Sequence, residues 1–227
     1  MIEIGPGPGG LTRALLESDA RRVIAIEVDA RAVAALDELR AHWPDRLEIC
    51  AADALDIDAA SLGTRPRKIV ANLPYNVSIA LLTAWLPKLD AFESLTLMFQ
   101  REVADRLLAK PGGKDYGRLT VATQWRARVR RLFEIPPRAF TPPPKVTSTL
   151  VAIEPLPAPL APADPVALEK IVAAAFGQRR KMLRQSLRSL IPQAETLLDR
   201  AGIDGTARAE TLTIEQFCAL ARAYKER

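Results

Sequence analysis

Short β-rich runs alternate with helical patterns through the first two thirds of the chain, and this alternation constrains the fold more than any other feature. The predicted strands are Met1–Ile4, Val23–Glu27, Leu47–Ala51, Lys68–Ala71 and Leu95–Phe99, and the helical stretches between them include Leu11–Leu16, Ala30–Ala41 and Ser78–Leu86. Strands that alternate with helices form a parallel sheet covered by helices on both faces. The sequence therefore predicts an α/β domain.

Two later β-rich runs, Val129–Ile135 and Ser148–Ile153, are separated by a loop that contains three consecutive prolines. The connection is too short for another crossover helix, so we expect an antiparallel hairpin at the edge of the sheet. The predicted sheet is thus mostly parallel, with an antiparallel edge.

Five prolines within residues 155–165 exclude a helix or a central strand there and predict a stiff linker. The segments that follow all have helical patterns: Val166–Phe176, Arg179–Leu190, Ala194–Ala201 and Ile214–Lys225. Thr213 with Gln216 three residues later predicts a capping box at the start of the last helix. We expect an α/β domain over residues 1–154, a linker over 155–165 and a small all-α domain over 166–227.

Charge and composition narrow the class of protein. The net charge is +5, and basic residues gather in RARVRR (126–131) and FGQRRKMLRQSLR (176–188). Such clusters suit a polyanionic partner, although a solvated surface is an equal alternative on charge alone. No apolar run is long enough to span a membrane, and no signal peptide precedes the first strand. Cys50 and Cys218 match no metal spacing, and neither does the single histidine, His42, so we expect a cytoplasmic protein with reduced thiols and no metal.

A glycine-rich turn, Gly5-Pro6-Gly7-Pro8-Gly9-Gly10, lies between the first predicted strand and the first helix. Gly5, Gly7 and Gly10 satisfy the G-x-G-x-x-G pattern that lets backbone approach a ligand at the end of a strand. Glu27 ends the second strand, where a carboxylate can accept hydrogen bonds from both ribose hydroxyls. The pattern serves both NAD and S-adenosylmethionine, and a structural tight turn remains a further alternative.

Two polar features follow the third and fourth predicted strands. Asp53 is placed to accept a hydrogen bond from an adenine amino group, although taken alone such a residue is more often a turn former. Asn72-Leu73-Pro74-Tyr75 breaks the fourth strand abruptly. The Asn72 side chain and the Leu73 carbonyl supply two acceptors for an exocyclic amine, Pro74 stiffens the turn, and Tyr75 offers a stacking face.

These stretches carry a family resemblance. Residues 72–75 resemble the (D/N)-x-P-(Y/F) motif of methyltransferases that act on amino groups of nucleic acids. Joined to EIGPGPGGLT, to E-V-D at 27–29 and to D-A-L at 53–55, they resemble the ribosomal RNA adenine dimethyltransferase family. AFTPPPKVTSTLV (139–151) and AFGQRRKMLRQSL (175–187) are similar to signatures of its small-subunit branch, the KsgA/RsmA family.

The resemblance implies a Rossmann-like fold and N6,N6-dimethylation of two adjacent adenines near the 3′ end of small-subunit rRNA. It implies that Gly5, Gly7, Glu27, Asp53 and Asn72 bind S-adenosylmethionine. It also implies that the target adenine is held by Asn72, Leu73, Pro74 and Tyr75, with Phe140 on its other face. The partner would be the immature 30S subunit, bound by a monomer without metal or membrane. Clustered arginine suits RNA, so we predict RNA contacts for Arg179, Arg180, Lys181, Arg184 and Arg188.

The chain departs from the family pattern at its start. Family members carry a segment with a Gln-x-Phe-Leu type motif ahead of the first strand, whereas Met1 here lies inside that strand. The resemblance therefore predicts that half of the cofactor lid is missing from these residues. Two alternatives stay open: a non-catalytic RNA-binding or ribosome-assembly factor with this fold, and a large-subunit rRNA methyltransferase of the antibiotic-resistance type. An NAD-dependent oxidoreductase is weaker, because no catalytic acid or base accompanies the glycine loop.

Overall fold

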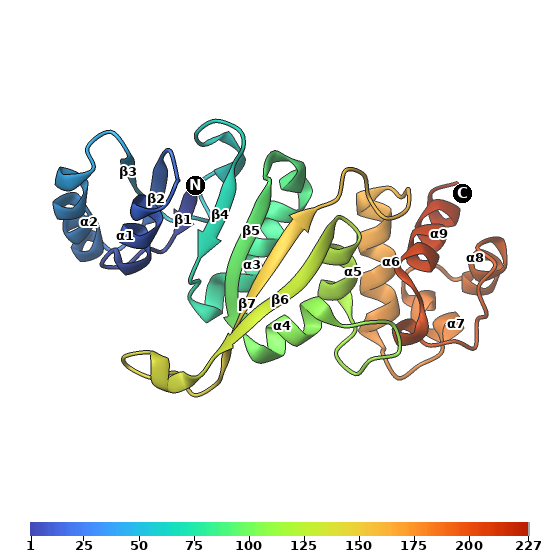
Figure 1. Cartoon of the computed structure of the whole chain (residues 1–227). Coiled ribbons are helices and arrows are strands. Elements are labelled where there is room, and N and C mark those ends of the chain that lie inside the picture. The colour runs from blue at the N-terminus through green and yellow to red at the C-terminus, as the bar shows by residue number, and fades with distance from the viewer. Residues whose placement is uncertain (227) are drawn as a thin grey trace. The chain divides into compact units, whose positions relative to one another are not determined.

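A computed structural model describes residues 1–226 (Figure 1). The chain forms two compact units. The first contains Met1–Ala104 and Arg130–Pro155, and the second contains Asp105–Val129 together with the chain from Leu156 onward. The second unit thus includes residues 105–129, which the predicted boundary at residue 154 places in the first domain.

The first unit is built around a sheet whose strand order is β3-β2-β1-β4-β5-β7-β6. The strands are β1 (Ile2–Ile4), β2 (Val23–Glu27), β3 (Leu47–Ala51), β4 (Lys68–Ala71), β5 (Ser94–Gln100), β6 (Ala127–Ile135) and β7 (Ser148–Pro155). The first five pair in parallel. The predicted α/β class and its mostly parallel sheet are confirmed.

The antiparallel part of the sheet lies at its far edge. β7 pairs antiparallel with β5, in a register that sets Leu95 opposite Ile153 and Gln100 opposite Ser148. β6 follows β7 as the edge strand, and Figure 1 shows the loop between these two strands extending beyond the sheet. Because β7 runs against its neighbour, its first residue lies at the edge where the parallel strands end.

Helices cover the parallel strands of this unit: α1 (Gly10–Glu17), α2 (Ala30–His42) and α3 (Tyr75–Trp85), with short 3-10 turns at Ala59–Ser61 and Leu86–Ala91. All five residues of β2 are buried, as expected for a parallel strand covered on both faces. Leu16 of α1 and Leu36 of α2 are fully buried in the cluster around Val23. The helices thus cover the faces of the central parallel strands.

The second unit is helical. It contains the C-terminal half of α4 (Arg101–Leu108), then α5 (Arg118–Gln124), α6 (Pro165–Gly177), α7 (Leu183–Ser186), α8 (Ala194–Arg200) and α9 (Ile214–Lys225). The predicted capping box of Thr213 and Gln216 at the start of α9 is confirmed.

The sequence did not predict α4 or α5. Tyr116, Val121 and Trp125 are buried in the core cluster of the second unit, and this packing joins residues 105–129 to the C-terminal helices. The proline-rich segment contacts the same residues: Leu160 N–H donates to the Trp125 carbonyl over 2.8 Å, and the Trp125 indole N–H donates to the Ala161 carbonyl over 2.8 Å.

The continuous helix predicted over Arg179–Leu190 is wrong. Only Leu183–Ser186 is α-helical, and a 3-10 turn, Leu187–Ser189, follows it. The backbone at the start of this helix pairs with residues 207 and 208 instead of continuing a helix. Met182 forms a β-bridge with Arg208, and Leu183 N–H donates to the Ala207 carbonyl over 2.8 Å. The first three basic residues of the segment therefore precede the helix.

Candidate active site

Polar residues gather where four neighbouring parallel strands end. Along the sheet order β3-β2-β1-β4, Asp53 follows β3, Glu27 is the last residue of β2, Gly5 follows β1 and Asn72 follows β4. Parallel strands present their carboxyl ends at one edge, and open α/β sheets bind ligands there. The structure thus brings these four predicted residues to one edge, which we call the cofactor edge.

The glycine loop connects β1 to α1 in a conformation that requires glycine. Gly5 and Gly7 have φ angles of 64° and 56°, in the left-handed region that side chains disfavour. A Cβ atom at Gly7 would meet no other atom within 4 Å, so the loop is open above that residue. Gly5 N–H donates to the Ile26 carbonyl over 3.0 Å, which fixes the loop to β2. This open, backbone-lined turn fits a ligand that approaches the main chain closely.

Glu27 is 8% exposed, and its carboxylate is already held by the main chain. One oxygen accepts from the N–H groups of Val28 and Asp29 over 2.8 and 2.9 Å, and the other accepts from Gly7 N–H over 3.0 Å. A carboxylate offers about four acceptor positions, so about one is left for a ribose hydroxyl. This limits the sequence interpretation, in which the same carboxylate accepts from both ribose hydroxyls. Sequence reasoning also missed that Glu27 shapes the glycine loop.

Asp53 is exposed and forms a turn. One of its carboxylate oxygens accepts from Leu55 N–H over 2.9 Å, the geometry expected of a turn-forming aspartate. Asp53 lies at the cofactor edge, and its hydrogen bond with Leu55 N–H uses only one of its two carboxylate oxygens. The turn-forming and adenine-binding interpretations are therefore compatible.

The Asn-Leu-Pro-Tyr segment turns the chain from β4 into α3. Pro74 is the N-cap residue of α3, and Tyr75 is the first residue of the helix. The side chain of Asn72 is exposed, whereas Leu73 is 1% exposed and anchors the turn in the core. A Cβ atom at Gly5 would lie 3.8 Å from Cδ of Pro74. The glycine loop and this segment are thus direct neighbours.

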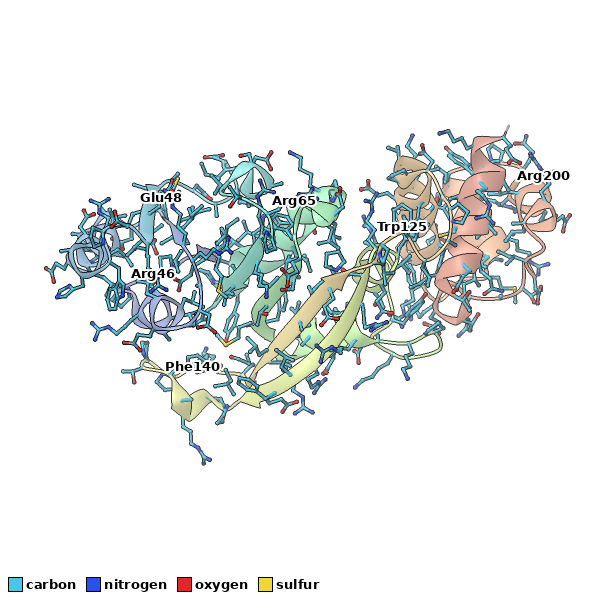
Figure 2. The ribbon with its side chains drawn as sticks, turned by 45° about the horizontal axis from the view of Figure 1, so that its top comes forward. Arg46, Glu48, Arg65, Trp125, Phe140 and Arg200 are labelled. Carbon is cyan, nitrogen blue, oxygen red and sulfur yellow. The ribbon has the colours of Figure 1, made fainter. Side chains whose placement is uncertain are left out.

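Phe140 lies in the loop between β6 and β7, directly after the 3-10 turn Pro137–Ala139. The residue is partly buried, and Figure 2 shows it in the loop that extends from the strands. It belongs to the same unit as Tyr75, but within residues 1–226 no ring contact joins the two. Its predicted place on the second face of an adenine stays a prediction.

A buried carboxyl group in the first strand was not singled out from the sequence. Glu3 of β1 is 1% exposed, and one of its carboxylate oxygens is buried without a hydrogen-bond partner. Burial raises the pKa of Glu3 to about 7; the Thr12 hydroxyl lowers it in part, and the negative charge of Glu27 raises it further. The sequence did offer a sign of this buried carboxyl group, because Glu3 lies inside the predicted strand Met1–Ile4. The first strand thus holds a carboxyl group that is easily protonated.

Ser148 was also missed. Its hydroxyl lies 2.6 Å from the phenol oxygen of Tyr75, and the residue is fully buried at the start of β7. No sequence spacing could have indicated this pair, because the two residues belong to segments that only the sheet brings together.

The predicted RNA-binding residues lie in the second unit, in a stretch that we call the basic segment (residues 179–188). Arg180, Lys181 and Arg184 are exposed. Arg179 is not free in the same way, because its guanidinium donates to Glu210 over 2.7 Å and to the Gly113 carbonyl over 3.2 Å. These contacts hold the loop before α5. Arg179 therefore has a structural task in addition to any contact with RNA.

Arg188 closes the basic segment and lies 3.6 Å from Glu195 in an exposed ion pair. Ion pairs of this kind contribute little to stability and exchange readily for another anion. The basic segment thus combines one held arginine with several solvent-exposed cations.

Within residues 1–226, no group of three or more histidine, cysteine, aspartate or glutamate side chains is arranged to hold a metal ion. In the same part of the chain, no helix has both the length and the apolar character needed to cross a bilayer.

The glycine loop after β1, the carboxylate at the end of β2 and the Asn-Leu-Pro-Tyr turn after β4 define a class, the methyltransferases that use S-adenosylmethionine to methylate amino groups of nucleic acids. Residues 1–226 match the family described as "Ribosomal RNA adenine dimethylase". The chain belongs to that family, and its cofactor is S-adenosylmethionine.

Comparison with individual proteins agrees with this family. The chain is 63% identical over 223 residues to "Ribosomal RNA small subunit methyltransferase A" of Rhodospirillum rubrum, which covers 98% of this chain and 77% of that protein. A crystal structure of a dimethyladenosine transferase from Plasmodium falciparum has a TM-score of 0.85 at 24% identity, covering 99% of this chain and 89% of that one. The 23S rRNA methyltransferase ErmE has a TM-score of 0.70 at 29% identity, over 99% and 90%.

Proposed function

We propose that this chain dimethylates N6 of two adjacent adenines near the 3′ end of small-subunit rRNA, and that it acts as a monomer on the immature 30S subunit in the cytoplasm. The observation that carries the proposal is the cofactor edge, where the residues expected to hold the methyl donor lie beside the Asn-Leu-Pro-Tyr turn. The small-subunit substrate is supported by 63% identity to a relative named for that activity.

The cofactor edge suits S-adenosylmethionine, which supplies an electrophilic methyl group on a positively charged sulfur. Gly5 and Gly7 leave room for close approach to the backbone. Glu27, already oriented by three N–H donors, would accept from a ribose hydroxyl, and the second carboxylate oxygen of Asp53 would accept from the adenine amino group of the cofactor. Because these acceptors are in place before binding, little reorganisation is required.

The Asn-Leu-Pro-Tyr turn would hold the target base. The lone pair of adenine N6 is delocalised into the ring, which makes it a poor nucleophile. Acceptors at the Asn72 side chain and the Leu73 carbonyl would grip its two hydrogens and direct the lone pair toward the methyl group. Pro74 fixes the turn, and the ring faces of Tyr75 and Phe140 would stack on the base. Positioning of this kind supplies much of the rate without a general base of unusual pKa.

RNA outside the pocket would be bound by the basic segment. Rigid RNA structures are recognised mainly through shape and phosphates, for which exposed guanidinium and ammonium groups are suited. Arg180, Lys181, Arg184 and Arg188 have this exposure. Arg179 would contribute by holding the neighbouring loop as well as through its charge.

The proposal is tested by incubating the 227-residue chain with radiolabelled S-adenosylmethionine and undermethylated small subunits, then mapping the label. Label at two adjacent adenines near the 3′ end is expected. Large subunits serve as the parallel substrate, because label there instead would favour the antibiotic-resistance type of activity. Absence of label on both, in a preparation that binds the cofactor calorimetrically, would contradict the proposal.

The non-catalytic alternative is separated by the same calorimetric titration. A ribosome-assembly factor that only retains the fold would bind small subunits without binding S-adenosylmethionine. Glu27 favours cofactor binding over this alternative, because its three main-chain hydrogen bonds orient the carboxylate at the cofactor edge and leave about one acceptor position open.

A further inference from the structure

The phenol of Tyr75 is tied to β7, which lies two strands along the sheet from β4. Its oxygen lies 2.6 Å from the hydroxyl oxygen of Ser148, and either group can donate the hydrogen bond. Ser148 is fully buried and Tyr75 is partly buried, so the bond is partly shielded from competition by water. The two residues are 73 positions apart along the chain.

Ser148 is placed at the cofactor edge by strand direction. It is the first residue of β7 and lies opposite Gln100, the last residue of β5. β5 separates β7 from β4, the strand that ends in the Asn-Leu-Pro-Tyr turn. The hydrogen bond therefore reaches from the start of α3 past the end of β5, along the edge where the reaction is proposed.

The main chain of Tyr75 is fixed as well. The hydroxyl of Ser78, which is 1% exposed, donates to the Tyr75 carbonyl over 3.0 Å. Tyr75 is thus held at its backbone and at its phenol, leaving the two side-chain torsions little freedom. With the hydroxyl engaged, the ring faces are what the residue can offer to a base, since stacking depends on ring orientation.

We propose that Ser148 is a positioning residue for methyl transfer, which holds the Tyr75 ring in the orientation that stacks on the target adenine. The inference rests on the proposed function, because it assigns Ser148 a task in that reaction. It differs from a purely structural role, in which Ser148 would only satisfy a buried hydroxyl and its loss would affect stability but not turnover.

The neighbouring residue provides a matched control. Thr149 is also fully buried, and its hydroxyl has no hydrogen-bond partner in the structure. Thr149→Val removes a buried hydroxyl one position away without breaking a bond. Ser148→Ala and Tyr75→Phe each remove one partner of the Tyr75–Ser148 bond, and the double variant removes both.

The first measurement is a double-mutant cycle of thermal unfolding, which reports the bond independently of any activity. Coupling between Ser148→Ala and Tyr75→Phe is expected, since the second change removes nothing once the first has broken the bond. Additive effects would overturn the inference at this stage. Thr149→Val is expected to unfold close to the wild-type temperature.

The second measurement is methylation of undermethylated small subunits. Ser148→Ala and Tyr75→Phe are each expected to lower kcat about five- to tenfold, the double variant no further, and Thr149→Val less than about twofold. The KM for S-adenosylmethionine is expected to change less than about twofold in all four. If Ser148→Ala kept the wild-type kcat, the role of Ser148 would be structural only, and the inference would be overturned. An inactive wild type would instead refute the proposed function. The double-mutant cycle of unfolding would still decide whether the Tyr75–Ser148 bond exists.

Discussion

The cofactor edge of the first unit and the basic segment of the second unit present polar groups in opposite ways. At the cofactor edge the main chain holds the side chains: Glu27 accepts three N–H groups, and Asp53 accepts one. In the basic segment, Arg180, Lys181 and Arg184 are exposed to solvent, and only Arg179 is held firmly. A small ligand with fixed hydroxyl and amino groups requires acceptors at fixed positions. A polyanion requires chiefly positive charge that can adjust to many phosphates.

The largest effect that tests this difference between the cofactor edge and the basic segment is expected at Asn72. Asn72→Ala removes an acceptor from the end of β4 and is expected to lower the rate of methyl transfer about 100-fold or more, because orientation of N6 supplies much of the rate. Single-turnover transfer of a radiolabelled methyl group to undermethylated small subunits measures the effect. Asn76→Ala, at an exposed asparagine in the first turn of α3, is the matched control. A variant that keeps a third of the wild-type rate would show that the edge does not work as proposed.

A second large effect is expected at Glu27. In Glu27→Gln the amide nitrogen cannot accept a hydrogen bond, so at least one loop N–H loses its partner. We expect the dissociation constant for S-adenosylmethionine to rise about ten- to a hundredfold, and the free energy of unfolding to fall by about 1 kcal/mol. Calorimetric titration and thermal unfolding measure the two effects. Glu48→Gln on the adjacent strand β3, where the carboxylate forms only an exposed ion pair with Arg22, is expected to change neither.

Glu3 predicts a pH-dependent effect within the first unit. Burial raises its pKa from 4.5 to about 7, so the folded chain binds a proton more tightly than the unfolded chain does. The stability associated with this proton is complete below pH 4.5 and is lost as the pH rises through 7. Glu3→Gln does not titrate, so it should be more stable than wild type by about 2 kcal/mol at pH 8, with a smaller difference at pH 5. Equal differences at both pH values, measured by chemical denaturation without cofactor, would contradict this assignment.

The basic segment gives the smallest effects and separates its held arginine from an exposed one. Arg180→Ala is expected to leave stability unchanged and to reduce by about 1 the slope of log Kd against log salt for small-subunit RNA. Arg179→Ala should additionally lower the free energy of unfolding of the second unit by about 1 kcal/mol, because Glu210 and the Gly113 carbonyl lose their donor. Binding at several salt concentrations and thermal unfolding test both variants. Identical behaviour of the two would remove the distinction between a held and an exposed arginine.

The cofactor edge could be predicted from sequence because strand ends are local features. Once a parallel sheet was inferred, Gly5, Glu27, Asp53 and Asn72 had to lie near its carboxyl edge, and the sheet confirms this placement. Their binding roles stay predictions. The hydrogen bond from Gly7 N–H to Glu27 depends on the bend of the glycine loop, which no residue pattern specifies.

Other parts depended on tertiary contacts that the sequence does not reveal. The break in the helix predicted over Arg179–Leu190 depends on backbone pairing between Met182 and Arg208. Residues 105–129 join the second unit because Tyr116 and Trp125 pack in its core. These contacts are long-range, so the spacing of apolar residues along the chain does not reveal them. Ser148 lay within a predicted strand, but its partner was set by strand order.

The pairing of β1 with β4 has a consequence for how the site comes into being. Ile2 is paired with Ile69, and Glu3 with Val70, so the loop for the methyl donor and the turn for the base are joined through segments distant in the chain. Neither half is in its working geometry until this pairing has formed. The ability to bind cofactor should therefore appear late and in a single step during refolding, and bound cofactor should slow amide hydrogen exchange in both strands together.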